Sequence, residues 1–201
     1  MTQTRTLHGT RLSGHTHRVQ LFLHLLDLPY TYADSPAAVR ATPAFRALNL
    51  LGQIPVLQED DVVLADSNAI LVYLAKRYAP GSAWLPEDPV GAARVQRWLS
   101  QAAGEIMYGP AAARVSARFY DTGVPAALAQ KLAARVLGLM EGELAARDWL
   151  AGTTPTIADV ACYSYIAHAP EGGIALDPYP QVRAWIARVQ ALPGFVPMPT
   201  E

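Results

Sequence analysis

Polar residues stand at two positions where helices are expected to begin. Ser13-Gly14 precedes the first apolar helical stretch, and Asp66-Ser67 precedes a later one. The first turn of a helix leaves backbone N–H groups without intrahelical partners, so a helix N-terminus is a natural anion site. Ser67 could add its hydroxyl there as a further donor. The plainer alternative is that Ser67 or Asp66 only caps the helix, although one group can do both.

A third feature is the Ile54-Pro55 step, which precedes a short apolar run. An X-Pro bond adopts the cis form at modest cost, and a cis proline in a folded protein is usually a deliberate feature. A cis bond would turn the backbone of Ile54 outward, where its N–H and C=O could pair with an extended ligand. The alternative is an ordinary proline at the start of a strand, and the residues alone leave both open.

The histidines and the single cysteine do not suggest metal or disulfide chemistry. His15 and His17 have no acidic residue between them, and their spacing matches no standard ligand pattern, so we expect no metal site. Cys162 is the only cysteine, which excludes a disulfide framework and fits a reducing compartment.

The composition excludes several classes of protein. The chain has 201 residues, a formal net charge of -1, 51% hydrophobic residues and 16% charged residues, which excludes a disordered chain. The near-neutral balance argues against a nucleic-acid partner. No segment approaches the roughly 18 apolar residues of a membrane span. The first residues are too polar for a secretory signal, so we expect a cytoplasmic protein with no membrane partner.

The first 78 residues alternate between strand-like and helix-like patterns. In chain order we expect a strand at 4–8, a helix at 19–26, a strand at 30–32, a helix at 43–49, a hairpin of 56–57 with 62–64, and a helix at 67–78. Thr42 and Ser67 are the expected caps of the last two helices. The first two strands, joined by a crossover helix, should be parallel. This order is thioredoxin-like, although no Cys-x-x-Cys follows the first strand.

The remainder of the chain shows no strand pattern. Residues 79–89 are rich in proline and glycine and form the clearest linker. Helical periodicity runs through 90–107, 126–149, 157–167 and 182–192. Gly109-Pro110 should end or kink the first of these helices, and Thr156-x-x-Asp159 has the form of a capping box. We therefore expect a thioredoxin-like α/β domain at 1–80, a linker at 81–88 and an all-helical bundle domain at 89–201.

Three segments in this order and spacing resemble the cytosolic glutathione transferase superfamily, and the resemblance covers essentially the whole chain. The segments are Ser13-Gly14-His15-Thr16-His17-Arg18-Val19, Gly52-Gln53-Ile54-Pro55-Val56-Leu57 and Asp66-Ser67-Asn68-Ala69-Ile70-Leu71-Val72-Tyr73-Leu74. The hydroxyl-led first segment looks most like the serine-type bacterial branches, which are theta- and zeta-like. No tyrosine stands in the loop after the first strand, unlike in the tyrosine-type classes.

The resemblance implies that glutathione is the co-substrate and that the Ile54-Pro55 bond is cis. The γ-glutamyl carboxylate would bind at Ser67, with Asp66 facing the ammonium group. Further contacts would come from the amide of Gln53 and from a contact of Arg40 with the glycine carboxylate. The implied glutathione-binding residues are Ser13, Arg40, Gln53, Ile54, Pro55, Asp66 and Ser67.

Ser13 is the expected catalytic residue. A thiol of this kind has a pKa of about 8.5, and the thiolate is the nucleophile. A hydroxyl donor and the positive end of a helix would both favour the thiolate. Thr10 and Thr16 are rival hydroxyls. His15 is a further rival, because a neutral imidazole could donate to the sulfur and a protonated one could attract it.

The resemblance further implies a homodimeric transferase that conjugates glutathione to a small electrophilic, largely apolar substrate. His15 and Tyr108 are candidates for the second-substrate pocket. One alternative is a glutathione-dependent peroxidase or another glutathione-dependent enzyme, such as a haloacid or ring-opening catalyst, because fold does not fix chemistry. Another is a non-catalytic binding protein that keeps the fold. The identity of the electrophile is beyond what one sequence indicates.

Overall fold

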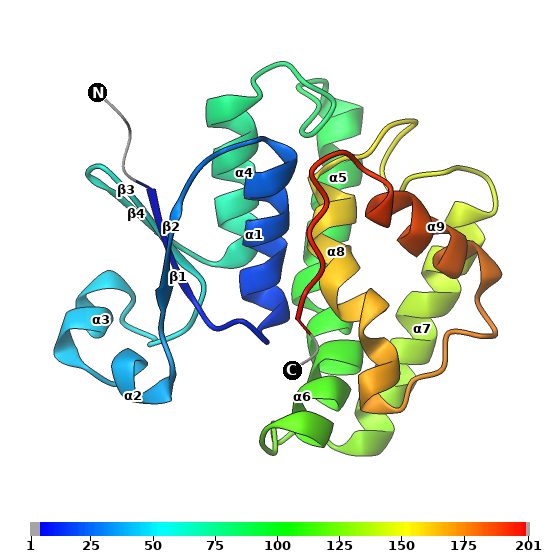
Figure 1. Ribbon diagram of the computed structural model, residues 1–201. Coiled ribbons are helices and arrows are strands. Elements are labelled where there is room, and N and C mark those ends of the chain that lie inside the picture. Colours follow the sequence, from blue (N-terminus) through cyan, green and yellow to red (C-terminus); the bar gives the residue numbers. More distant parts are fainter. Residues whose placement is uncertain (1–4, 200–201) are drawn as a thin grey trace. The chain divides into compact units, whose positions relative to one another are not determined.

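A computed structural model describes residues 5–199, so the expected strand start at Thr4 lies outside the described residues (Figure 1). The chain divides into two compact units. The first runs to Pro80 and also contains the segment from Pro193 onward, and the second is Gly81–Leu192.

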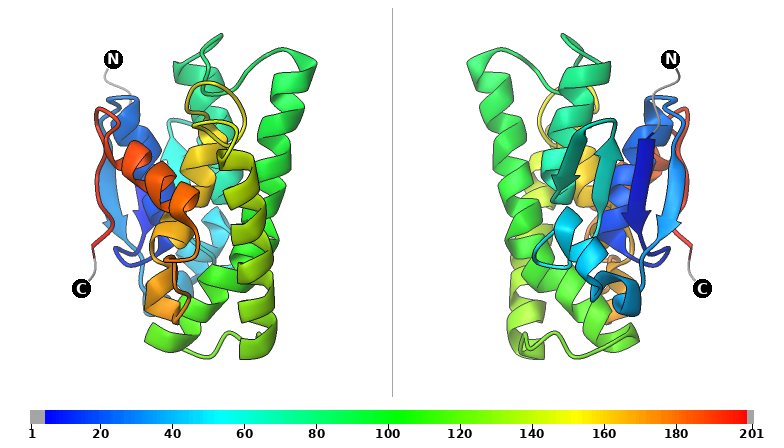
Figure 2. Two further views of the ribbon diagram at one scale, coloured as in Figure 1. Left: turned by 90° about the vertical axis from the view of Figure 1, so that its right-hand side faces the viewer. Right: turned by 90° about the vertical axis from the view of Figure 1, so that its left-hand side faces the viewer.

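The first unit contains a four-stranded mixed sheet. Its strands are β1 (Arg5–Gly9), β2 (Thr31–Asp34), β3 (Val56–Glu59) and β4 (Val62–Ala65), in the order β2-β1-β3-β4 (Figure 2, right). Leu7 on β1 lies opposite Tyr32 on the parallel neighbour β2 and opposite Leu57 on the antiparallel neighbour β3. The predicted parallel pairing of the first two strands is therefore confirmed, as is the thioredoxin-like arrangement of this unit.

Four helices accompany the sheet: α1 (Gly14–Leu25), α2 (Ala37–Arg40), α3 (Pro43–Leu48) and α4 (Ser67–Tyr78). Helices α1 and α4 pack side by side on one face of the sheet, and α2 and α3 lie on its other side (Figure 1). Helix α1 begins five residues before the expected position 19, because the apolar stretch marks only its buried part. Helix α2 was not predicted, since its four residues bury no side chain and leave no apolar pattern.

All of the regular secondary structure described in the second unit is helical, and loops join its helices. Its elements are α5 (Pro89–Ala103), the π-helical turn η1 (Met107–Ala111), α6 (Ala112–Arg118), α7 (Ala126–Leu144), α8 (Ile157–Ala167), the 3-10 turn η2 (Ala169–Gly172) and α9 (Pro180–Gln190). The expected disturbance at Gly109-Pro110 is the π-helical turn. A Cβ atom on Gly109 would lie 2.8 Å from the backbone nitrogen of Ala133, so glycine permits close approach to α7.

The capping box at the start of α8 is present as predicted. Asp159 is fully buried, and its carboxylate accepts hydrogen bonds from the backbone of Leu150 and Thr156 and from Trp185 Nε1. Burial raises the pKa of Asp159 despite these bonds. Within residues 5–199, no helix combines the length and apolar character needed to cross a membrane.

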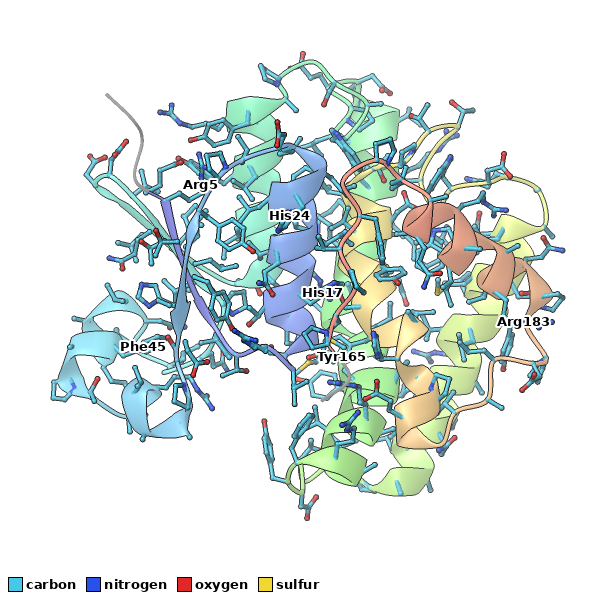
Figure 3. The ribbon with its side chains drawn as sticks, viewed as in Figure 1. Arg5, His17, His24, Phe45, Tyr165 and Arg183 are labelled. Carbon is cyan, nitrogen blue, oxygen red and sulfur yellow. The ribbon has the colours of Figure 1, made fainter. Side chains whose placement is uncertain are left out.

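The segment after Pro193 packs on α1 of the first unit. His17 lies beside it, with Nε2 2.9 Å from the carbonyl oxygen of Val196 (Figure 3). Gly194 has φ +84°, and a Cβ atom on it would lie 2.7 Å from the carbonyl oxygen of His24. Met198 is buried. The last described residues therefore belong to the same compact unit as the sheet.

Candidate functional site

Ser13 is the N-cap of α1. It has an extended backbone conformation, and its Oγ accepts a hydrogen bond from the backbone N–H of Thr16 at 3.3 Å. Its own N–H donates to the carbonyl oxygen of Thr10 at 3.1 Å. A hydroxyl has one proton and two lone pairs, so the capping bond leaves the Ser13 proton for a further acceptor. The side chain is half-buried and lies at the N-terminal end of the helix.

The rival hydroxyl of Thr16 faces a different environment. Thr16 is fully buried, and a Cβ atom on Gly9 would lie only 2.2 Å from its Cγ2 atom. Within the part of the chain that the structure describes, Thr16 Oγ1 makes no hydrogen bond. Thr16 is therefore packed tightly against β1, which leaves it less accessible than Ser13 to a ligand.

His15, on the first turn of α1, lies next to the start of α4. Its Nδ1 is 3.4 Å from Ser67 Oγ. Burial, assisted by the positive charge of Arg18, lowers the pKa of His15 from 6.5 to about 3. The imidazole is therefore neutral near pH 7, and of the two ways in which it could favour a thiolate only hydrogen-bond donation remains.

The helix cap of α4 differs from the prediction. Asp66, and not Ser67, is the N-cap, and Asp66 Oδ1 accepts from the backbone N–H groups of Asn68 and Ala69, each at 2.9 Å. The expectation of a Ser67 cap was wrong and the alternative of an Asp66 cap is confirmed, because Ser67 is the first helical residue and the Asp66 carboxylate reaches both N–H groups. Asp66 adopts φ +72°, a backbone conformation that costs about 1–3 kcal/mol and concentrates at functional sites.

The turn before β3 carries the remaining predicted residues. The Ile54-Pro55 bond is cis, as expected. Arg40 Nη1 donates to the carbonyl oxygen of Gly52 at 3.2 Å, which brings this arginine from α2 to the turn. Gln53 is exposed, and its backbone carbonyl accepts a hydrogen bond from Asn49 Nδ2 at 3.0 Å.

The structure thus gathers the predicted residues into two groups within the first unit. Ser13, His15 and Ser67 lie at the N-terminal ends of α1 and α4, and Arg40 lies at the turn that leads to Pro55. Tyr108 belongs to the second unit, on the π-helical turn, where its side chain is 53% exposed. Among the described residues, no three His, Cys, Asp or Glu side chains are arranged to hold a metal ion.

Comparison with known proteins gives this arrangement a family. Residues 12–77 match the glutathione S-transferase N-terminal domain, and residues 124–193 match the glutathione S-transferase C-terminal domain. The glutathione S-transferase-like protein tpcF of Aspergillus fumigatus is 32% identical, over 88% of this chain and 87% of its own length. The chain belongs to the glutathione S-transferase family. Its activity class is accordingly that of a glutathione transferase.

Solved structures agree with this assignment. The glutathione S-transferase of Pseudomonas fluorescens superposes with a TM-score of 0.89 at 34% identity, covering 96% of this chain and 98% of that one. A glutathione transferase homologue from Drosophila mojavensis, solved with bound glutathione, gives a TM-score of 0.83 at 26% identity, covering 95% of this chain and 89% of that one. The serine-type branch of the family stays a prediction for this transferase.

Sequence reasoning missed two residues of this transferase, Arg18 on α1 and Asn68 on α4, which link the two helices. Arg18 Nη1 donates to Ser67 Oγ and to Asn68 Oδ1, each at 2.8 Å, although Arg18 is only 1% exposed. One signal could have found it, because an arginine directly before the apolar stretch of a largely buried helix needs polar partners. Asn68 gave no such signal, since an asparagine in the first turn of a helix is ordinary.

Proposed function

We propose that this transferase binds glutathione at the N-terminal ends of α1 and α4 and that Ser13 donates a hydrogen bond to its thiolate. The observation that carries the proposal is the cap geometry, in which Ser13 Oγ accepts from Thr16 and keeps its proton for a ligand. The helix N-terminus adds favourable potential. Lowering the thiol pKa by one unit requires only about 1.4 kcal/mol, which one charge-assisted hydrogen bond can supply.

The rest of the tripeptide would follow the elements on either side. The γ-glutamyl carboxylate would bind at the N–H and hydroxyl of Ser67, with its ammonium group facing Asp66. The backbone of Ile54, before Pro55, would pair with the peptide-like middle. The relative that was solved with bound glutathione supports the choice of this ligand.

Gln53 and Arg40 would contact glutathione from the turn that precedes β3. The exposed amide of Gln53 is available for a further contact, and Arg40 would bind the glycine carboxylate. The support for Arg40 is its hydrogen bond to Gly52, directly before the Gln53 position.

The second substrate would be a small, largely apolar electrophile, and the thiolate would form a bond to its electrophilic carbon. We place Tyr108 in its pocket, because π-helical turns within helices occur frequently at functional sites and this side chain is exposed. His15 contacts Ser67, so we assign it to the γ-glutamyl end of the site. Catalysis would come mainly from thiolate stabilisation and from proximity.

We also propose that the enzyme works as a homodimer in the cytoplasm, with residues 1–80 as the glutathione-binding domain and 89–201 as the helical one. Leu50 and Leu51 are 83% and 71% exposed, and adjacent exposed leucines are candidates for a subunit contact. The single buried cysteine fits a reducing compartment.

Ultraviolet difference absorbance of bound glutathione, followed against pH, tests the role of Ser13. The unaltered enzyme should form thiolate at least about one pH unit below the free thiol value of about 8.5. Ser13→Ala should return the pKa toward that value and lower turnover about tenfold. Thr10→Ala is the matched control and should leave the pKa unchanged. An unchanged thiolate pKa in Ser13→Ala would remove Ser13 from this role.

A further inference from the structure

We propose that Arg18 is a positioning residue that sets Ser67 to donate its hydroxyl proton and makes the start of α4 selective for the carboxylate of an α-amino acid. This inference rests on the proposed function, because it takes the γ-glutamyl end of glutathione to bind there. It adds a buried cation to a subsite that the sequence motifs describe only through Asp66 and Ser67.

One nitrogen atom of the Arg18 guanidinium group donates hydrogen bonds to two side chains of α4. Arg18 Nη1 lies 2.8 Å from Ser67 Oγ and 2.8 Å from Asn68 Oδ1. The two acceptors are the first two residues of α4, and Arg18 belongs to α1. One guanidinium group therefore links α1 to the first turn of α4. Hydrogen bonds to a charged donor are stronger than neutral ones, so this link holds both side chains firmly.

The bond from Arg18 decides what the Ser67 hydroxyl can do. Because Ser67 Oγ accepts from the guanidinium, the hydroxyl proton must point to another acceptor. Neutral His15 accepts through Nδ1 when its proton is on Nε2, but Nδ1 lies 3.4 Å from Ser67 Oγ, which is longer than a good hydrogen bond. A ligand carboxylate can replace that weak contact with a strong one. The neutral state of His15, whose pKa is lowered to about 3, keeps a second positive charge out of the cluster.

The charges on the two sides of Ser67 are opposite. Asp66 is exposed and places a carboxylate at the very start of the helix, where it would repel an anionic ligand group. Arg18 is only 1% exposed, and its positive charge beneath Ser67 offsets that repulsion. Screening by water is weak for a buried charge. The pair Asp66 and Arg18 therefore matches the ammonium and carboxylate of one α-amino acid group.

The test compares two peptides on the same protein by titration calorimetry. One is glutathione, and the other is γ-aminobutyryl-Cys-Gly, which lacks only the α-carboxylate of the γ-glutamyl residue. Arg18→Met should weaken glutathione binding by about 10- to 100-fold, since a hydrogen-bonded charge is lost. The same variant should change binding of the shorter peptide by less than about 3-fold. Arg18→Lys, which keeps the charge, should recover part of the difference between the peptides.

Arg5→Lys is the matched control for the loss of a buried arginine in the same unit. Arg5 is 4% exposed and pairs with Glu59 on the neighbouring strand. Its replacement should lower the melting temperature and weaken both peptides equally, if it weakens them at all. Equal losses for the two peptides in folded Arg18→Lys would overturn the inference.

A double-mutant cycle keeps the inference testable if Arg18→Met does not fold. In a Ser67→Ala background, Arg18→Lys should no longer alter the preference for glutathione by more than about 2-fold, because the arginine acts through the serine. An undiminished effect in that background would overturn the role through Ser67. Failure of the unaltered protein to bind glutathione would instead overturn the proposed function, and the inference with it.

Discussion

His17 donates a hydrogen bond from Nε2 to the backbone carbonyl of Val196, 179 positions later in the chain, at 2.9 Å. A carbonyl oxygen only accepts, so Nε2 carries a proton in this contact. His17 is buried and lies between His15 and Arg18 on the first turns of α1. The segment after Pro193 therefore supports the helix that presents Ser13.

Gly194→Ala tests how tightly this segment is held. The substitution should lower the free energy of unfolding by about 2–4 kcal/mol, because φ +84° is unfavourable for alanine and its Cβ would lie 2.7 Å from the carbonyl oxygen of His24. Chemical denaturation monitored by circular dichroism measures the change.

Gly81→Ala is the matched control for Gly194→Ala. Gly81 has φ +69°, but a Cβ atom there meets no heavy atom within 4 Å. Gly81→Ala should therefore cost only the backbone term, about 1 kcal/mol. If the two variants lose the same free energy of unfolding, the segment after Pro193 does not pack tightly against α1.

Glu59→Gln tests the buried ion pair of the sheet. Glu59 pairs with Arg5 and accepts hydrogen bonds from the hydroxyl groups of Tyr73 and Tyr78. Burial alone would raise the pKa of Glu59, but the two tyrosine hydrogen bonds and the Arg5 charge outweigh burial and lower it. The substitution leaves Arg5 buried without a countercharge, so it should cost about 3–5 kcal/mol at pH 7.

The sign of the pH dependence follows from the lowered pKa of Glu59. A carboxylate with a depressed pKa stabilises the fold above its unfolded value of about 4.3, and the contribution is lost as the pH falls through the folded-state value. The gap between the wild type and Glu59→Gln should therefore narrow in acid. Glu143→Gln, at a surface pair with Arg97, should cost at most about 1 kcal/mol. A gap that widens below pH 4 would contradict this account.

His15→Asn tests the neutral state of the imidazole. The folded-state pKa of His15 is about 3 and its ordinary value is 6.5, so the unfolded chain binds the proton more readily between these values. The stability contributed by neutral His15 is fully present above pH 6.5 and declines as the pH falls toward 3. His15→Asn should flatten that decline, as urea unfolding at several pH values would show.

Nuclear magnetic resonance of the imidazole nitrogens gives a direct check on His15. Its signals should keep their neutral positions from pH 8 down to about pH 4. His24→Asn is the comparison variant and should leave the His15 signals unchanged, because the His24 side chain is exposed on the same helix. A His15 transition near pH 6.5 would restore the charged imidazole as a means of attracting the thiolate.

Local patterns were sufficient to predict most of the fold. The cap by Thr42 and the capping box of Thr156 and Asp159 were read directly from residue types and spacing, and both are present. The start of α1 was placed too late, because Gly14 to Arg18 carry no apolar periodicity and are ordered by the Ser13 cap and by tertiary contacts.

The site was predicted less completely than the fold. Motifs indicated Ser13, Asp66 and Ser67. These residues stand at the starts of helices, and residue types and spacing predict such positions. The bonds from Arg18 to Ser67 and Asn68 join positions about 50 residues apart, and no local pattern encodes such a distance. Residue type alone did not decide between Ser67 and Asp66 as the cap of α4, because serine and aspartate are both common N-caps.

Asp66→Asn separates the helix cap from the proposed ammonium contact. Asparagine tolerates a positive φ and caps helices as well as aspartate does, so the melting temperature should change little. Loss of the carboxylate charge should weaken glutathione binding by about 2- to 5-fold, the range expected for an exposed charge pair. Calorimetry with glutathione measures the loss.

Glutaryl-Cys-Gly, which lacks only the amino group of the γ-glutamyl residue, is the matched ligand for Asp66→Asn. Without an ammonium group the peptide cannot gain from the Asp66 charge, and removing that charge should leave its binding unchanged or slightly stronger. Asp66→Ala would weaken both peptides, because it also removes the two bonds from Asp66 Oδ1 to the N–H groups of Asn68 and Ala69. If Asp66→Asn weakens the two peptides equally, Asp66 acts only as a cap.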